Sequence, residues 1–460
     1  MRGKLALVSM LTVVALAGTS GVFAANFTPG SSGLGDPFFP LGGNGGYEVD
    51  HYGLTLAYDP PSNQLTGTAV IAATATQDLS QFDLDLRGFT ITELDVNGTA
   101  ALFARSGQEL VITPAVGLPA RRPFTVTVHY EGTPTVVTDP DQSIEGWVPT
   151  DDGAVSVGEP QGSPGWFPCN DNPQDKATYD FAVTVPAGLT VMANGVLVSS
   201  TTSGDGATTT WVWHEADPMA TYLATADVGV FNLTRSSVDG IPSYVAVDPQ
   251  LAKGQVLSKL PDIVRFYSSI YGPYPFTAVG AIVDSAKNLG YSLETQTKPL
   301  FPYVPNEATL AHELSHMWFG DSATLGRWPD IWLHEGFATW SEWIWSEYTG
   351  NKSAAQYFKQ LYSTPAKDLA FWNPPPGNPG TPDLMFDGTI YYRGGMTLEA
   401  LREKIGDLAF FQLIKDWATQ NRYGNVTTPQ FIALAEKWAG RDLTQFFDAW
   451  IFQDAKPTVW

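Results

Sequence analysis

The sequence predicts an α+β protein in which a half built from antiparallel β-sheets precedes a mainly helical half. Apolar and polar residues alternate along 52–58, 66–76 and 124–130, as they do in strands that bury one face. From about residue 260 onward, apolar residues recur at helical spacing, and capping residues such as Asn306 stand before these stretches. A chain of 460 residues is long enough for two or three domains with substantial cores.

Turn signals divide the first half into short strands. Asn97-Gly98 and Asn194-Gly195 are typical of tight hairpins, and no long helical pattern interrupts the region. We therefore expect antiparallel sheets packed as a sandwich-like domain over residues 47–236. The composition changes near Val238-Asp239-Gly240, so we place the second domain at residues 237–460.

The second half begins with short strands and continues with helices. Strands are expected at 244–247, 278–283 and 291–297, and a helix through 263–270 follows Pro261. Asn306 is a favourable N-cap for the next helix, and Thr428 is the expected cap of a helix that begins at Pro429. The other helices are expected at 330–348, 353–361, 391–405, 407–420 and 443–452, and the proline-rich stretch 371–383 is expected to be a loop.

The amino terminus has the pattern of an export signal. Arg2 and Lys4 precede an apolar run over 5–17, and Val22-Phe23-Ala24 has the form of a cleavage site, so residues 1–24 are read as a signal peptide. Residues 25–46 are rich in glycine, proline and serine and form a leader that is either flexible or ordered by contact. Because no lipid-acceptor cysteine follows the run, we expect a secreted protein without stable membrane association.

Charge and cysteine content narrow the classes of partner. The net charge of −22 argues against binding to nucleic acid or to anionic membranes. Cys169 is the only cysteine, which rules out an intramolecular disulfide. A buried apolar role suits Cys169 better than a catalytic thiol. We expect a monomer.

The most informative motif is His312-Glu313-Leu314-Ser315-His316. On a helix, positions four apart share a face, so the two imidazoles can reach one Zn²⁺ ion while Glu313 lies beside it as a potential general base. The alternative is a helix with two surface histidines. An apolar stripe that includes Leu314 and Trp318 favours a buried helix instead.

A catalytic zinc site needs a third protein ligand. Glu335 follows His316 by nineteen residues, with a glycine- and proline-containing loop between two predicted helices, and this loop can fold the second helix across the first. Glu335 is then the third ligand of a single zinc ion per chain. Glu342 lies two turns further on the same face and could orient a ligand histidine, or it could be an ordinary surface carboxylate.

These segments carry a resemblance to a known family. The run 312–320, together with Trp332-Leu333-His334-Glu335-Gly336-Phe337-Ala338, resembles the zinc aminopeptidases of the aminopeptidase N family, which are gluzincins. The segments 271–276 and 167–173 are also similar to family segments, so the resemblance covers about residues 47–455. It implies a β domain followed by a thermolysin-like catalytic domain. Longer family members carry further domains that narrow access, so we expect a more open cleft here.

The resemblance also implies two carboxylates that bind the free amine of a peptide. The family's exopeptidase motif, usually Gly-Ala-Met-Glu-Asn, corresponds to residues 291–295, where Glu294 is kept and Thr295 replaces the amide. Glu159, nine residues before Pro168, matches the second amine-binding position. The alternatives are that Glu294 only discourages pairing at a sheet edge and that Glu159 is a plain loop acid.

A third implied role is stabilisation of the oxyanion. Tyr391-Tyr392-Arg393-Gly394 resembles the family signature Tyr-x-Lys/Arg-Gly, which assigns the functional phenol to Tyr391, with Tyr392 as the alternative. His334 replaces a common family asparagine and has no assigned role.

Together these patterns predict a secreted zinc aminopeptidase that hydrolyses the first peptide bond of peptides with a free N-terminus. Two alternatives remain open at this point. One is a zinc endopeptidase of the gluzincin class, and the other is a catalytically silent protein that binds zinc or peptide.

Overall fold

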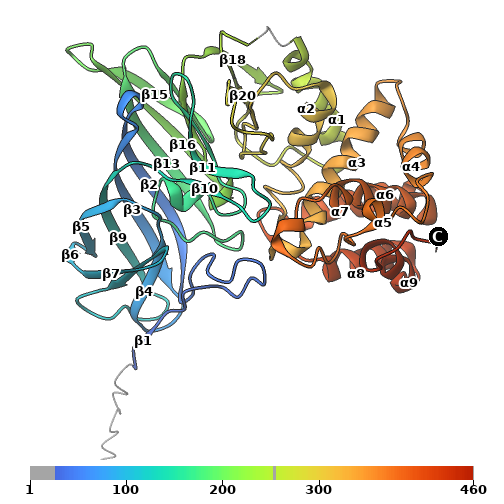
Figure 1. The fold of residues 1–460 in the computed structure, drawn as a ribbon, viewed down its shortest axis with the longest axis horizontal. Helices are drawn as coiled ribbons and strands as arrows, with labels where there is room; N and C mark the ends of the chain where they lie inside the picture. The colour runs from blue at the N-terminus through green and yellow to red at the C-terminus, as the bar shows by residue number, and fades with distance from the viewer. Residues whose placement is uncertain (1–25, 252–254, 459–460) are drawn as a thin grey trace, which may run out of the picture.

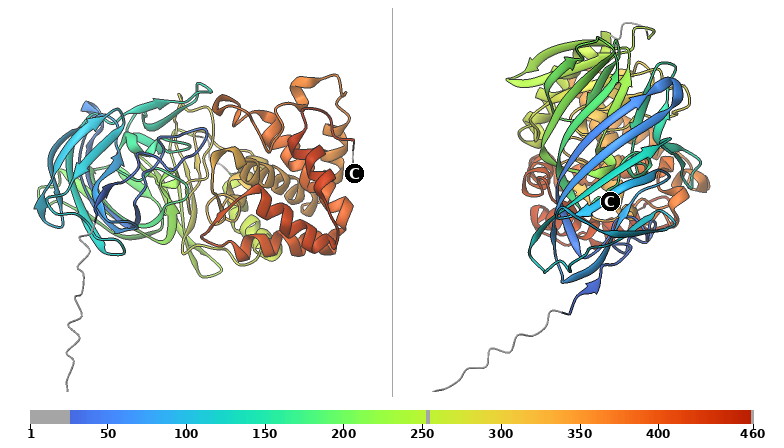
Figure 2. Two further views of the ribbon diagram at one scale, coloured as in Figure 1. Left: turned by 90° about the horizontal axis from the view of Figure 1, so that it is seen from below. Right: turned by 90° about the vertical axis from the view of Figure 1, so that its left-hand side faces the viewer.

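The computed structural model describes residues 26–251 and 255–458. It places a β half beside a helical half, as Figure 1 shows from the front and Figure 2 from two further sides. This is the predicted α+β architecture. The signal peptide expected at residues 1–24 lies outside the described residues.

An eight-stranded sheet forms the body of the β half, in the order β15-β16-β13-β2-β3-β9-β5-β6. Its strands are β2 (Tyr47–Asp59), β3 (Gln64–Ala75), β5 (Thr90–Val96), β6 (Thr99–Ala100), β9 (Pro123–Gly132), β13 (Lys176–Pro186), β15 (Val196–Thr202) and β16 (Thr208–Ala220). Neighbours run antiparallel except β13 and β2, which are parallel. The exception arises because β13 does not follow β2 through a hairpin but enters after a long excursion through another sheet.

Two smaller sheets pack on this one. They are the four-stranded sheet β1 (Thr28–Pro29), β4 (Leu79–Asp85), β8 (Glu109–Thr113), β7 (Leu102–Ser106), and the five-stranded sheet β10 (Val136–Thr138), β11 (Ile144–Pro149), β12 (Ala154–Val157), β17 (Ala226–Gly229), β14 (Thr190–Ala193). Tyr47 on β2 meets Phe82 on β4 with ring centroids 5.6 Å apart, and Tyr58 meets Trp147 on β11 at 5.0 Å. These aromatic contacts between layers give the sandwich-like core.

The second half contains its own mixed sheet, β18 (Asn232–Val238), β19 (Ile241–Val247), β20 (Val279–Val283) and β21 (Leu300–Phe301). The turn at Asp239-Gly240 joins β18 to β19, so it lies inside this sheet and not at its border. The chain passes from the five-stranded sheet to this one between Gly229 and Asn232. The strand predicted over 291–297 is wrong. That segment makes only an isolated bridge, Leu293 with Leu300, before a turn in which Thr297 has a φ of 72°.

Helices cover the remaining chain. They are α1 (Leu260–Tyr271), α2 (Glu307–Ser315), α3 (Trp332–Tyr348), α4 (Ala354–Tyr362), α5 (Leu369–Trp372), α6 (Gly388–Ile405), α7 (Asp407–Gln420), α8 (Thr428–Ala439) and α9 (Thr444–Phe447), and a two-stranded pairing joins β22 (Thr324–Leu325) to β23 (Asn425–Val426). Asn306 caps α2 as expected, because its side chain accepts a hydrogen bond from the Thr309 N–H at 2.9 Å.

Two predictions at helix ends need correction. The cap of α8 is Thr427, not Thr428, because Thr428 is the first helical residue and its hydroxyl donates instead to buried Asp330 at 2.6 Å. The stretch 371–383 is mostly loop, but its first residues belong to the short helix α5.

The expected leader lies against both halves. Residues 28–29 form β1, which pairs with β4, and the Asp36 carboxylate accepts a hydrogen bond from the Trp328 N–H at 2.8 Å. Across residues 26–251 and 255–458, no helix combines the length and apolar character needed to cross a membrane.

Candidate active site

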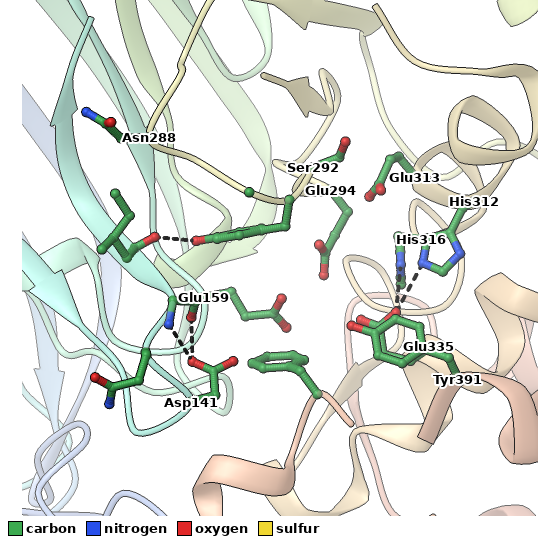
Figure 3. A pocket seen from close by; sticks show the side chains of 16 residues that line it. Asp141, Glu159, Asn288, Ser292, Glu294, His312, Glu313, His316, Glu335 and Tyr391 are labelled. Atoms are coloured by element: carbon green, nitrogen blue, oxygen red, sulfur yellow. Dashed lines mark hydrogen bonds and ion pairs between the residues drawn. The ribbon is translucent and has the colours of Figure 1, made fainter. Parts of the chain in front are cut away.

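Two helices bring together the three side chains predicted to bind metal. His312 lies in the last turn of α2, His316 directly follows its end, and Glu335 is in the first turn of α3. Glu335 Oε2 lies 3.1 Å from His312 Nε2 and 3.7 Å from His316 Nε2. Figure 3 shows the two imidazoles and this carboxylate converging on one point at the edge of a cavity.

The far side of each imidazole is held by an acceptor. His312 Nδ1 lies 2.7 Å from Glu342 Oε1, and His316 Nδ1 lies 3.0 Å from the backbone carbonyl oxygen of Phe319. A proton on each Nδ1 atom satisfies these bonds and leaves the Nε2 lone pairs free to bind a metal. Of the two positions that the sequence left open for Glu342, the structure shows the one behind His312 and not the one on the open surface.

A close crossing of α3 and α6 carries Tyr391 into the site. The helices touch at Gly336 and Gly394, where a Cβ atom built on Gly394 would lie 2.8 Å from the Gly336 Cα atom. The Tyr391 ring stacks near His312 with centroids 6.1 Å apart, whereas Tyr392 is 48% exposed and points away. Buried Arg393 anchors α6 by donating to backbone carbonyls near the C-terminus.

The two carboxylates expected to bind an amine come from different halves of the chain. Glu159 follows β12, and Glu294 lies in the extended segment before β21. Each has one buried oxygen without a hydrogen-bond partner among the described residues. Asn194 of the β half donates to the Gln296 carbonyl at 2.8 Å and so ties the Glu294 segment to the other half. Figure 3 shows both carboxylates pointing into the cavity.

One cavity of about 560 Å³ joins all these groups. Seven of the eight predicted site residues line it: Glu159, Glu294, His312, Glu313, His316, Glu335 and Tyr391. The eighth, Glu342, supports His312 from behind. Among the described residues that line the cavity, none is lysine or arginine, and four of its glutamates are at most 7% exposed.

Burial and mutual repulsion shape the charges of this cavity. Burial raises the pKa of Glu313 to about 8, and burial together with the neighbouring carboxylates raises the pKa of Glu159 and of Glu294 well above its usual range. Burial alone would raise the pKa of Glu335, but the two imidazoles beside it lower it overall. A cluster of this kind is favourable only when cations bind it, because each carboxylate opposes ionisation of the next.

The donor set fits a zinc ion. Two imidazole nitrogens and one carboxylate oxygen are common zinc ligands, and all three atoms lie within 4.8 Å of one another. Ligand atoms bound at 2.0–2.1 Å in a tetrahedral arrangement are separated by roughly 3.3 Å. The observed separations of 3.1 and 3.7 Å from Glu335 are close to this value.

Comparison with known proteins agrees with this geometry. Residues 48–223 match the family model described as Peptidase M1 N-terminal domain, and residues 295–450 match the one described as Peptidase family M1 domain. The chain belongs to the M1 peptidase family. The aminopeptidase N resemblance noted in the sequence is therefore confirmed.

Curated relatives within the family are distant and longer. Aminopeptidase N of Streptomyces lividans is 26% identical over 88% of this chain and 50% of its own length. Aminopeptidase M1 of Arabidopsis thaliana is 26% identical over 66% of this chain and 37% of its own length. The chain thus spans half or less of the length of these two relatives.

Solved structures match over nearly the whole chain. The M1 zinc metallopeptidase from Deinococcus radiodurans superimposes with a TM-score of 0.84 at 28% identity, over 93% of this chain and 98% of that one. A mutant of the Deinococcus protein bound to a Tyr-Ser-Ala substrate matches with the same score and coverage. The arrangement of β domain and helical domain is therefore shared with a two-domain M1 enzyme.

Several contributors to this M1 site were not identifiable from the sequence. Asp141, which lines the cavity from a turn of the β half, has no spacing signal because tertiary folding places it. The Phe319 carbonyl lies only three residues after His316, but a backbone acceptor leaves no signal in the residue types of a motif. His334 is buried, and its Nε2 atom accepts from the Leu325 N–H at 2.8 Å, which ties α3 to β22. Cys169 is buried and free, as expected for a packing residue.

Proposed function

We propose that the protein is a zinc-dependent aminopeptidase that removes the first residue of peptides with a free N-terminus. One observation carries the proposal. Two buried carboxylates with unpartnered oxygens, Glu159 and Glu294, share a cavity with the His312, His316 and Glu335 donor set. Paired carboxylates suit a substrate ammonium group, and the nearby donor set suits a metal that acts on the adjacent peptide bond.

His312, His316 and Glu335 would hold one zinc ion. Glu342 orients the imidazole ring of His312, and the Phe319 carbonyl orients that of His316. When bound, zinc supplies Lewis acidity, which polarises a carbonyl group and makes a water molecule easier to deprotonate. Glu342 and Phe319 contribute by keeping the Nδ1 protons in place, so that both Nε2 atoms remain available.

Glu313 is the proposed general base. Its carboxylate lines the cavity beside the donor set and is 6% exposed. It removes a proton from the attacking water while the water oxygen bonds to the carbonyl carbon. The same proton then passes to the leaving nitrogen as the peptide C–N bond breaks, which returns Glu313 to its charged form.

Tyr391 is the proposed donor to the developing oxyanion. Its ring lies beside His312, and its side chain lines the cavity. A donor that is already in place as negative charge forms on the carbonyl oxygen stabilises the transition state more than the substrate.

Glu159 and Glu294 are the proposed binding groups for the α-ammonium group of the substrate. Charge-assisted hydrogen bonds from the ammonium group to both carboxylates place the first peptide bond next to Glu313 and Tyr391. An endopeptidase has no need for paired buried carboxylates at this position, and a silent binding protein has no need for Glu313 and Tyr391. The geometry therefore favours an aminopeptidase over both alternatives.

The test is product analysis on a peptide of about six residues with a free N-terminus. We expect stepwise loss of single residues from the amino end by mass spectrometry, abolished by a chelator and restored by zinc. Glu313→Gln should bind zinc as the wild type does and show no turnover. Internal fragments as the main products, or full activity of Glu313→Gln, would contradict the proposal.

We also propose that the protein is exported and acts as a monomer. The pattern of residues 1–24 supports export, and a single chain supplies the metal-binding, amine-binding and tyrosine side chains that line the cavity. N-terminal sequencing of protein recovered from the medium should begin at Ala25, and light scattering should give the mass of one chain.

A further inference from the structure

The cavity continues past the two amine-binding carboxylates. Its far end is formed by the turn between β10 and β11, where Asp141, Gln142 and Ser143 line the wall. Figure 3 places Asp141 beyond Glu159 when viewed from Glu335, on the side away from the metal-binding donor set. This end takes no part in the chemistry described above.

Only one part of a peptide can enter this region. If the ammonium group is held at Glu159 and Glu294 and the first carbonyl lies at the donor set, the main chain starts at the carboxylates and leads away from Asp141. The space beyond Glu159 is then accessible only to the side chain of the first residue, provided that this side chain is long. This step rests on the proposed aminopeptidase function.

Asp141 presents a fixed acidic group to that space. Its Oδ1 atom accepts hydrogen bonds from the Ser143 N–H at 2.9 Å and from the Ser143 hydroxyl at 2.6 Å. Among the described residues, none donates to its Oδ2 atom, and no lysine or arginine lines the cavity to compensate its charge. A carboxylate that is oriented by its own turn loses little freedom when it binds a cation.

The walls of the cavity suit an aliphatic chain that carries a charge at its end. Tyr291 and Phe386 contribute aromatic rings to the lining, and the Tyr291 hydroxyl donates to the Ile144 carbonyl at 2.9 Å, which fixes that ring against the same β-turn. Methylene groups of lysine or arginine pack on such rings, and a cation near an aromatic face gains a further attraction.

We propose that the enzyme prefers peptides whose first residue is arginine or lysine, and that Asp141 is the residue that selects the cationic side chain. Asp141 forms an ion pair with the guanidinium or ammonium group while Glu159 and Glu294 hold the α-amine. The first residue is thus bound by acids at two separate points.

The test compares arginyl and citrullinyl amides with the same fluorogenic leaving group, because citrulline has nearly the shape of arginine without its charge. We expect wild-type kcat/KM to favour arginine roughly tenfold, as for a hydrogen-bonded charge pair. Asp141→Asn should bring the ratio close to one by lowering the arginine value alone. Asp141→Lys should reverse the preference.

A matched control is Asp205→Asn. Asp205 is also an exposed aspartate in a turn, and its carboxylate accepts from the hydroxyl of Ser203, as that of Asp141 accepts from the hydroxyl of Ser143, but Asp205 does not line the cavity. Its ratio should equal that of the wild type. Equal cleavage of both amides by the wild type, or an unchanged ratio in both Asp141 variants, would overturn the assignment and leave the aminopeptidase proposal intact. Failure of the wild type to cut either amide would count instead against the proposed function.

Discussion

At the scale of single residues, Tyr391 and Tyr392 are neighbouring phenols that lie in different surroundings. Tyr391 lines the cavity beside His312, whereas Tyr392 is 48% exposed on the outer face of α6. Adjacent helical positions are about 100° apart, so the two rings cannot face the same site. The pair therefore offers a matched comparison within one helix turn.

We predict that Tyr391→Phe lowers kcat about 10²- to 10³-fold with little change in KM, because it removes a donor that acts mainly in the transition state. Tyr392→Phe should behave as the wild type. Steady-state kinetics of both variants on one peptide decide the matter. The assignment fails if Tyr392→Phe is the more damaging change.

A residue of the candidate site could be predicted from the sequence where local spacing determines its position. His312, Glu313 and His316 belong to one helical face, so their proximity followed from the sequence. The choice of Tyr391 over Tyr392 came from the family resemblance, and the structure places Tyr391 on the cavity wall. Asp141 could not be anticipated, because a turn of the β half reaches the cavity only through tertiary packing.

At the scale of elements, the crossing of α3 and α6 sets the distance between Glu335 and Tyr391. Gly336 directly follows Glu335, and Gly394 comes three residues after Tyr391. The two glycines face each other, and the space between them has no room for a side chain. Small residues permit such close approach of two helix backbones. The site geometry therefore depends on two residues that carry no chemistry.

We predict that Gly394→Ala destabilises the fold by about 1–3 kcal/mol, as overpacking does, and lowers kcat by moving Tyr391 away from Glu335. Gly388→Ala is the matched control, since a Cβ atom there would lie no closer than 3.7 Å to its neighbours. Denaturant unfolding and kinetics should separate the two variants. Equal stability of both would show that the crossing tolerates a methyl group.

Element boundaries were predictable where one residue alone could act as a cap. Asn306 begins α2 because its side chain is well placed for the Thr309 N–H. At α8 two adjacent threonines compete, and the choice of Thr427 depends on Asp330, which binds the Thr428 hydroxyl from another segment. The segment 291–297 alternates like a strand, yet it turns at Thr297 because its partners lie in the β half.

At the scale of the whole molecule, hydrogen bonds between the two halves fix the separation of Glu159 and Glu294. Asn194 donates across the boundary to the Gln296 carbonyl at 2.8 Å. Within the β half it donates to the Leu223 carbonyl at 2.9 Å, and its Oδ1 atom accepts from the Thr225 N–H at 2.8 Å, which holds the side chain in place. Its side chain is fully buried. Glu159 and Glu294 thus lie in one cavity only when the halves are docked.

We predict that Asn194→Ala raises KM for free peptides roughly tenfold while kcat changes less, because Glu294 shifts relative to Glu159 but the groups on α2, α3 and α6 stay in place. Asn351→Ala, at an exposed loop asparagine, should leave both constants unchanged. The idea is contradicted if Asn194→Ala lowers the unfolding temperature without any change in KM.

The central claim is that the site binds the free α-amine of a peptide and cleaves the peptide bond next to it. One comparison tests this claim most directly. The same peptide is offered with a free and with an N-acetylated first residue, and kcat/KM is measured for both. Acetylation removes the charge that Glu159 and Glu294 bind and leaves two buried carboxylates without a partner, so we predict a loss of at least about a hundredfold. Equal cleavage of the two peptides would contradict the claim and indicate an endopeptidase.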